Sequence, residues 1–119
     1  MIAERLADVR ARIDRACLDA GRDPADVALL AVSKNHPPEA VLAAWEAGQR
    51  RFGESYVQQW QSKAEDPRVL RLAGLEWRFI GHLQRNKVRF LLGRVDVIET
   101  IDSLRLARAV AQKADERGA

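Results

Sequence analysis

Residues 27–34 read Val-Ala-Leu-Leu-Ala-Val-Ser-Lys, a continuous apolar run that ends at Ser33 and Lys34. Such a run is typical of a strand that is buried on both faces, as in a parallel sheet. A lysine at its end places an amine at the rim of a core, where loss of hydration disfavours the charged form. A neutral lysine amine is a nucleophile towards aldehydes. The segment therefore predicts either a reactive Lys34 or a lysine that ends the strand and reaches water.

Helix and strand patterns alternate on both sides of this run. Apolar residues at spacings of three and four predict an amphipathic helix from Ile2 to Gly21, before the run. Further strands are expected at 51–54, 77–80 and 95–101. Helices are expected at 37–48, 56–64 and 84–92, and a last one from a cap at Asp102 or Ser103 to a C-terminal cap at Gly118.

Four strand–helix alternations with short loops predict parallel βαβ units with right-handed crossovers. The residues after the first strand, 33–37, carry no glycine-rich dinucleotide fingerprint, which argues against a doubly wound sheet. A (βα)8 barrel takes about 250 residues, and the chain has 119. We therefore predict an α/β fold that is the first half of a TIM-barrel-like (βα)8 structure. It consists of an N-terminal helix and four βα units, with residues 1–119 as one domain.

Composition excludes several classes of protein. Apolar residues make up 47% and charged residues 31% of the chain, as in ordinary soluble globular proteins. No apolar run approaches the roughly 20 residues that span a bilayer, and the N-terminus lacks a signal-peptide pattern. The arginines are interleaved with acids and the net charge is only +3, which argues against nucleic acid as a partner. Cys17 is the single cysteine, so we expect a cytoplasmic protein without an internal disulfide or a membrane partner.

Five short motifs resemble one family in residue type and order. They are 31–34 (Ala-Val-Ser-Lys), 47–49 (Ala-Gly-Gln), 52–57 (Phe-Gly-Glu-Ser-Tyr-Val), 77–87 (Trp-Arg-Phe-Ile-Gly-His-Leu-Gln-Arg-Asn-Lys) and 100–103 (Thr-Ile-Asp-Ser). The chain resembles the pyridoxal phosphate homeostasis proteins, single-domain barrels similar to the N-terminal domain of alanine racemases. The resemblance covers the whole chain but only the first half of the family's usual length.

The resemblance implies that Lys34 holds pyridoxal 5'-phosphate as a Schiff base at the C-terminal end of the first strand. The ends of the other strands are then expected to face the same cofactor: Glu54-Ser55, Gly81-His82 and Thr100-Ile101. The cofactor-binding residues implied in this way are Lys34, Ser55, Gly81, His82 and Thr100. The resemblance implies no catalytic residue and no metal ligand.

Three positions depart from the family pattern. Asn35 stands where threonine is common, Ser55 where the family usually has asparagine, and His82 where proline is frequent. Ser55 offers a hydroxyl in place of a carboxamide, which alters any hydrogen bond near the cofactor. His82 either adds a titratable group to the site or is a loop histidine that faces solvent.

The resemblance implies a function in intracellular pyridoxal phosphate homeostasis, by binding and without catalysis. A racemase-like enzyme is an alternative, but racemisation needs a second acid/base group, which the alanine racemases take from an extra domain and a partner subunit. In the family, the cofactor's phosphate is held by the second half of the barrel. We therefore expect that two chains pair, that another polypeptide completes the barrel, or that the sequence is a fragment that binds no cofactor.

Overall fold

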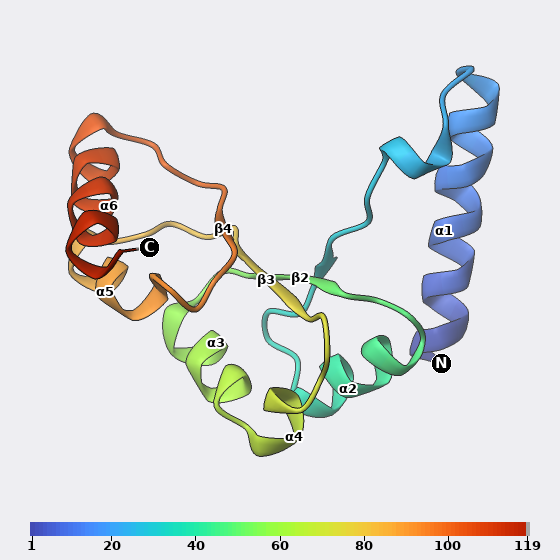
Figure 1. Cartoon of the computed structure of the whole chain (residues 1–119). Coiled ribbons are helices and arrows are strands. Elements are labelled where there is room, and N and C mark those ends of the chain that lie inside the picture. Colours follow the sequence, from blue (N-terminus) through green and yellow to red (C-terminus); the bar gives the residue numbers. More distant parts are fainter. Residues whose placement is uncertain (119) are drawn as a thin grey trace.

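The computed structural model describes residues 1–118 and contains one parallel sheet of four strands in the order β1-β2-β3-β4 (Figure 1). The strands are β1 (Ala31–Val32), β2 (Arg51–Glu54), β3 (Glu76–Phe79) and β4 (Val97–Ile98). Each strand pairs in parallel with the next strand along the chain. The sheet therefore advances in one direction without reversing, as in a (βα)8 barrel, and the predicted half-barrel is confirmed.

Helices lie on one side of the sheet and beyond its two edges. They are α1 (Ile2–Asp19), α2 (Pro38–Glu46), α3 (Val57–Ala64), α4 (Pro67–Leu70), α5 (Val88–Leu91) and α6 (Leu104–Arg117), with short 3-10 turns η1 (Pro24–Asp26) and η2 (Arg85–Lys87). Figure 1 shows α2, α3 and α4 together on one side of the sheet, α1 beyond its β1 edge, and α5 and α6 beyond β4. No helix within residues 1–118 covers the opposite side, which we call the open face.

The hydrophobic core fills the space between the sheet and the helices. From the sheet it takes Phe52, Trp77 and Phe79, and the rings of Phe52 and Trp77 lie with their centroids 6.0 Å apart. The helices and loops contribute Val41, Ala44, Trp60, Ala64, Val69, Leu83, Val88, Leu91 and Leu106. Burial alternates along β3, because successive strand residues point to opposite faces.

The first strand is shorter and less buried than the apolar run predicted. Only Ala31 and Val32 pair with β2, and Val32 is 47% exposed. The prediction of a strand buried on both faces was wrong, because Val32 lies on the open face. β4 is likewise shorter than the predicted 95–101. Within residues 1–118, β1 and β4 each have a paired strand on one side only.

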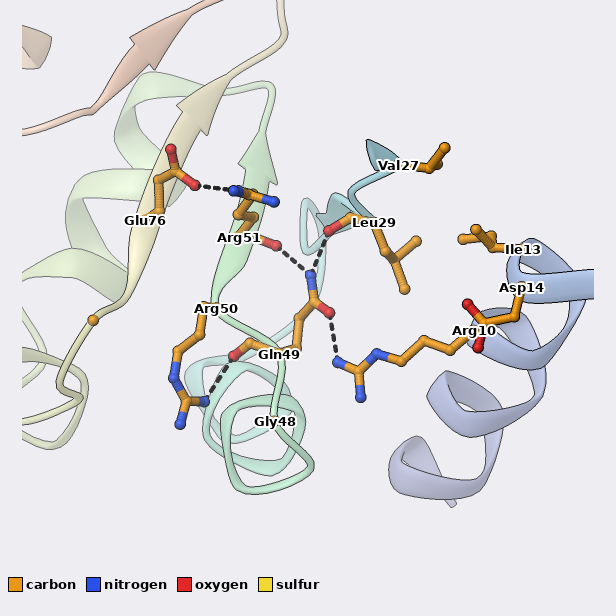
Figure 2. Close-up of a pocket in the computed structure, with 11 residues that line it drawn as sticks. Arg10, Ile13, Asp14, Val27, Leu29, Gly48, Gln49, Arg50, Arg51 and Glu76 are labelled. Atoms are coloured by element: carbon orange, nitrogen blue, oxygen red, sulfur yellow. Dashed lines mark hydrogen bonds and ion pairs between the residues drawn. The ribbon is translucent and has the colours of Figure 1, made fainter. Parts of the chain in front are cut away.

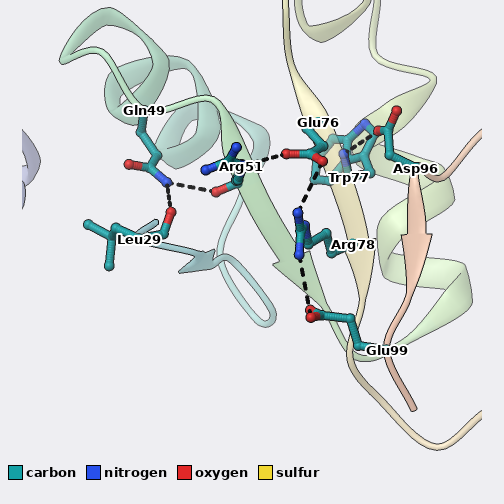
Figure 3. Close-up of polar contacts among 8 residues, drawn as sticks. All are labelled: Leu29, Gln49, Arg51, Glu76, Trp77, Arg78, Asp96 and Glu99. Atoms are coloured by element: carbon teal, nitrogen blue, oxygen red, sulfur yellow. Dashed lines mark hydrogen bonds and ion pairs between the residues drawn. The ribbon is translucent and has the colours of Figure 1, made fainter. Parts of the chain in front are cut away.

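The open face carries a row of alternating charges across three strands (Figure 3). Arg51 Nε donates to Glu76 Oε2 at 2.7 Å, and Arg78 reaches Glu76 Oε1 at 3.3 Å and Glu99 Oε1 at 3.5 Å. The parallel register aligns Arg51 with Glu76, which places both side chains on the same side of the sheet. This part of the open face is therefore polar and held by ion pairs, although Arg78 Nε is buried without a hydrogen-bond partner within residues 1–118.

The residues that cap the last helix were predicted correctly, whereas the extent of other helices differs from the prediction. Ser103 Oγ accepts a hydrogen bond from Leu106 N at 3.0 Å, and Gly118 ends α6 with φ +67°. The helix predicted at 84–92 is instead the 3-10 turn η2 followed by the single turn α5. α4 forms between the predicted helix 56–64 and the predicted strand 77–80, where no helix was expected, because Asp66 caps it and Pro67 occupies its first position.

The hydrogen bonds that cap α4 predict how the carboxyl group of Asp66 titrates. Asp66 accepts hydrogen bonds from the Arg68 side chain, at 2.8 Å from Nη2, and from the Arg68 backbone N–H at 2.9 Å; these bonds hold the pKa of Asp66 below its usual 3.8. Because the folded pKa is lowered, the stabilisation is present above the unfolded value and is lost as the pH falls through the folded value. We expect NMR titration of the Asp66 carboxyl to give a midpoint below 3.8, and Arg68→Ala to raise it. An unchanged midpoint in Arg68→Ala would contradict this assignment.

Candidate functional site

The C-terminal ends of the four strands lie along one edge of the sheet. Because the strands are parallel, the residues that follow them are brought to this same edge. Backbone hydrogen bonds continue the pairing past the strands, from Ser33 N to Gly53 O at 3.0 Å, from Ile80 N to Glu54 O at 2.9 Å and from Glu99 N to Phe79 O at 3.0 Å. The predicted site residues Lys34, Ser55, Gly81 and Thr100 therefore follow directly on a hydrogen-bonded sheet edge.

Gly81 lies against the backbone of Ser55, so the ends of β2 and β3 meet there without an intervening side chain. A Cβ added to Gly81 would lie under 3.0 Å from the Ser55 carbonyl oxygen and 2.6 Å from its carbonyl carbon. Thr100 Oγ1 donates a hydrogen bond to the Gly81 carbonyl oxygen, which joins the end of β4 to the same point. The structure thus brings together Ser55, Gly81 and Thr100.

His82 lies at the solvent-exposed side of this group. Its Nδ1 is 3.5 Å from Asp102 Oδ2, and both side chains are well exposed. Ser55 and His82 line the same open depression, together with Tyr56, Val57, Gln58, Gln84 and Lys87. Of the five predicted residues, His82 and Ser55 share this depression, and Lys34 is not among the residues that line it.

Lys34 is exposed in the turn that follows β1, as expected for a lysine that ends the strand and reaches water; its reactivity stays a prediction. Val32 is exposed, Ser33 is buried and Lys34 is exposed again. Residues 34–37 are all exposed, so no part of the chain within residues 1–118 removes water from this turn.

Glu54 faces the helices and not the site, which corrects the expectation that it lies beside the cofactor. It follows Phe52 on the core side of β2 and is 1% exposed. Its Oε2 accepts hydrogen bonds from Ser33 Oγ and from Lys63 Nζ, the latter at 2.8 Å, and Oε1 is buried with no partner within residues 1–118. The carboxylate of Glu54 therefore pairs with Lys63 inside the core.

The sequence reasoning missed Lys63, which is 4% exposed on α3. Besides its ion pair with Glu54, Lys63 Nζ donates to the Ser33 carbonyl oxygen at 2.5 Å. One signal was available: Lys63 falls between Trp60 and Ala64, both buried, at the spacing of the inner face of a helix. A lysine on such a stripe needs a buried acceptor, and Glu54 and Ser33 supply it.

Gln59, also missed, contacts the other side of the Lys34 turn. Gln59 Oε1 accepts a hydrogen bond from the Asn35 backbone N–H at 2.9 Å, and Gln59 Nε2 donates to Asn35 Oδ1 at 3.0 Å. Asn35 has a φ of +65°, a left-handed conformation that asparagine adopts more readily than most residues. No sequence pattern signalled this pair, because the two residues are far apart in the chain.

A second depression lies at the opposite, N-terminal edge of the sheet (Figure 2). At its centre is Gln49, which is 4% exposed. Gln49 Nε2 donates to Leu29 O and Arg51 O, both at 2.8 Å, and Gln49 Oε1 accepts from Arg10 Nη2 at 2.8 Å. Because both ends of this amide are paired within the protein, Gln49 joins α1 to the sheet and leaves no free group for a ligand.

Residues 1–118 show neither a membrane-spanning helix nor a cluster of metal ligands. None of the helices there combines the length and the apolar character that a bilayer crossing requires. The same residues hold no group of three or more His, Cys, Asp or Glu side chains placed to bind a metal ion.

No family model matches the sequence, but curated proteins do. The chain is 48% identical over 106 residues to the pyridoxal phosphate homeostasis protein of Escherichia coli (strain K12), a match that covers 89% of this chain and 45% of that protein. It is 43% identical over 112 residues to the pyridoxal phosphate homeostasis protein of Pseudomonas aeruginosa, covering 94% of this chain and 47% of that protein. The chain therefore spans about half the length of these relatives.

Solved structures share the fold over almost the whole chain. PipY of Synechococcus elongatus PCC7942, solved with PLP bound, superposes with a TM-score of 0.84 and 40% sequence identity, covering 99% of this chain and 50% of that one. An unknown protein from Bifidobacterium adolescentis superposes with a TM-score of 0.90 and 34% identity, over 98% of this chain and 51% of that one. In both, the described sheet and helices correspond to half of a larger structure.

Proposed function

This chain belongs to the pyridoxal phosphate homeostasis protein family, and on that premise we propose that it binds pyridoxal 5'-phosphate through Lys34. We propose that this binding serves intracellular homeostasis of the cofactor. The observation that carries the proposal is the superposition on PipY, which was solved with PLP bound. Because the chain spans only half the length of PipY, the function of the whole protein is proposed for this chain and is not established for it.

The residues at the sheet edge fit the chemistry of the cofactor. Pyridoxal phosphate supplies an aldehyde, which an amine attacks reversibly. Lys34 is exposed, and the residue before it, Ser33, pairs with β2. After losing a proton, Lys34 Nζ adds to the carbonyl carbon, a carbon–nitrogen bond forms and the oxygen leaves as water. Two other lysines lie near this edge: Lys63 already donates to two buried acceptors, and Lys87 lines the depression with Ser55 and His82.

The other predicted residues are proposed to shape and line the site. Ser55 and His82 line the depression at the strand ends, where a hydroxyl and an imidazole are able to bind polar groups of a ligand. Gly81 permits the close approach to Ser55, and Thr100 holds the Gly81 carbonyl group. Gly81 and Thr100 therefore act through the backbone at this edge.

We propose binding without catalysis. The relatives are named for homeostasis of the cofactor. Racemisation would need acid–base groups on two sides of the reacting carbon. Near the strand ends, Glu54 is turned into the core and His82 is exposed beside Asp102. Three alternatives stay predictions: a second copy covers the open face, another polypeptide covers it, or the sequence is a fragment. A monomer mass in sedimentation equilibrium would rule out the second copy.

Lys34→Arg is expected to abolish specific attachment of the cofactor. Arginine keeps the positive charge, but its guanidinium stays protonated and is no nucleophile at neutral pH. The chain is incubated with pyridoxal 5'-phosphate, reduced with borohydride and mapped by mass spectrometry over its four lysines, Lys34, Lys63, Lys87 and Lys113. We expect the label at Lys34, and its fall to background in Lys34→Arg.

Lys113→Arg is the matched control, because Lys113 lies on α6 with its amine near Glu116 and far from the strand ends in the chain. It should leave the label at Lys34 unchanged. Label spread evenly over Lys34, Lys87 and Lys113 would contradict the proposal, since it would show ordinary surface reactivity and no site.

A further inference from the structure

We infer that helix α3 positions Lys34 by holding the two peptide groups that flank it, with Lys63 on one side and Gln59 on the other. The inference deepens the proposed function and rests on it, since Lys34 is the amine proposed to take the cofactor. Neither Gln59 nor Lys63 touches the ligand in this scheme. Both are positioning residues, which act through the backbone of residues 33–35.

The first contact holds the peptide group between Ser33 and Lys34. Lys63 Nζ donates to the Ser33 carbonyl oxygen at 2.5 Å and to Glu54 Oε2 at 2.8 Å. Ser33 Oγ donates to the same Glu54 oxygen. Ser33, Glu54 and Lys63 are all at least 90% buried, so water does not compete for these bonds. The carbonyl group that precedes Lys34 is thereby fixed from inside the core.

The second contact holds the peptide group between Lys34 and Asn35. The N–H of this group donates to Gln59 Oε1 at 2.9 Å, and the Asn35 side chain accepts from Gln59 Nε2 at 3.0 Å. Two bonds in opposite directions fix the Gln59 amide relative to Asn35. They also hold Asn35 at its φ of +65°, which sets the direction of the chain after Lys34.

Both contacts come from one face of one helix. Gln59 and Lys63 are four residues apart on α3, a spacing that places them one above the other. α3 follows β2 and packs against it, and β2 pairs with β1. The backbone of Lys34 is therefore held while its side chain remains exposed. An amine on a fixed backbone loses less freedom when it attaches to a ligand than an amine on a mobile turn does.

The first test compares Gln59→Ala with Gln61→Ala, the same substitution on the same helix at a position with no side-chain hydrogen bond within residues 1–118. Amide hydrogen exchange at Asn35 is measured without cofactor. The ratio of label at Lys34 to label at Lys113 is measured after incubation with pyridoxal 5'-phosphate and borohydride reduction. We expect Gln59→Ala to speed exchange at Asn35 about two- to tenfold, the effect of one lost hydrogen bond, and to lower the labelling ratio. Gln61→Ala should change neither.

The outcomes separate the inference from the proposed function. Unchanged exchange at Asn35 in Gln59→Ala overturns the inference, and so does faster exchange with an unchanged labelling ratio. A wild-type chain that shows no preference for Lys34, together with faster Asn35 exchange in Gln59→Ala, means that the proposed function fails while α3 still holds the turn. A merely structural role would lower the melting temperature without moving the ratio among lysines.

A second variant tests the other contact without leaving a lone buried charge. Glu54→Gln combined with Lys63→Met removes both charges of the pair and the donor to the Ser33 carbonyl group. If the double variant melts cooperatively, we expect the ratio of label at Lys34 to label at Lys113 to fall as in Gln59→Ala. A folded double variant with the wild-type ratio would overturn the role of Lys63.

Discussion

Gly81→Ala is expected to destabilise the fold by about 3 kcal/mol or more, the upper end of the cost of overpacking. The added Cβ would lie under 3.0 Å from the Ser55 carbonyl oxygen, 2.6 Å from its carbonyl carbon and 2.7 Å from its Cα. These are backbone atoms, and Ser55 is held because the preceding Glu54 carbonyl bonds to Ile80 N. Relief therefore requires the ends of β2 and β3 to separate. The measurement is urea unfolding followed by tryptophan fluorescence.

Gly53→Ala is the matched control in the same pair of strands. There the new Cβ would meet only side-chain atoms, Ile80 Cδ1 at 3.0 Å and Leu30 Cδ2 at 3.3 Å. Both are ends of flexible side chains that are able to turn away, so the expected cost is about 1 kcal/mol. Equal free energies of unfolding for the two variants would show that the contact of Gly81 with Ser55 is not close in solution.

Lys63→Met is expected to cost about 3–5 kcal/mol, because it leaves the carboxylate of Glu54 buried without its cation. Glu54 is 1% exposed and its Oε1 has no hydrogen-bond partner within residues 1–118, so no second partner is at hand. Adding Glu54→Gln should recover much of the loss, since both charges of the buried pair are then removed. The free energies of unfolding of the wild type, the two single variants and the double variant form the cycle that measures the coupling.

The exposed pair of Lys113 and Glu116, whose atoms lie 3.3 Å apart on α6, provides the comparison. Lys113→Met should change the free energy of unfolding by less than about 1 kcal/mol, because water screens exposed pairs. If Lys63→Met were equally mild, the carboxyl of Glu54 would have to be protonated or hydrated in the folded chain, and the buried ion pair described above would be wrong.

Local patterns predicted much of the fold. β2 has the predicted bounds of Arg51–Glu54, and Ser103 and Gly118 cap α6 as expected. These features depend on neighbouring residues: apolar spacing, a side-chain oxygen before a helix and a glycine after it. The order of four strand–helix units also sufficed to predict a half-barrel, because short connections restrict the possible topologies.

The other features could not be predicted from local patterns, because they depend on contacts between residues far apart in the chain. The apolar run 27–32 is strand only at Ala31–Val32, where β2 lies alongside, because a strand needs a partner as well as a favourable composition. For the same reason, the positions of some strand-end residues were predicted correctly and that of another was not. Ser55, Gly81 and Thr100 follow strand ends and come together as the parallel sheet requires, whereas Glu54, one residue earlier, faces the helices.

The order of the elements, the parallel half-barrel, the position of Lys34 after a strand and the family to which the chain belongs follow from the amino-acid sequence alone. The burial of Glu54 and Lys63 in the core, and the contacts of Gln59 and Lys63 with the residues beside Lys34, became apparent from the folded chain. Periodicity and capping act over a few residues, but the hydrogen bonds of Lys63 and Gln59 to Ser33 and Asn35 join positions 30 and 24 residues apart. Their strength depends on the burial that the assembled core provides.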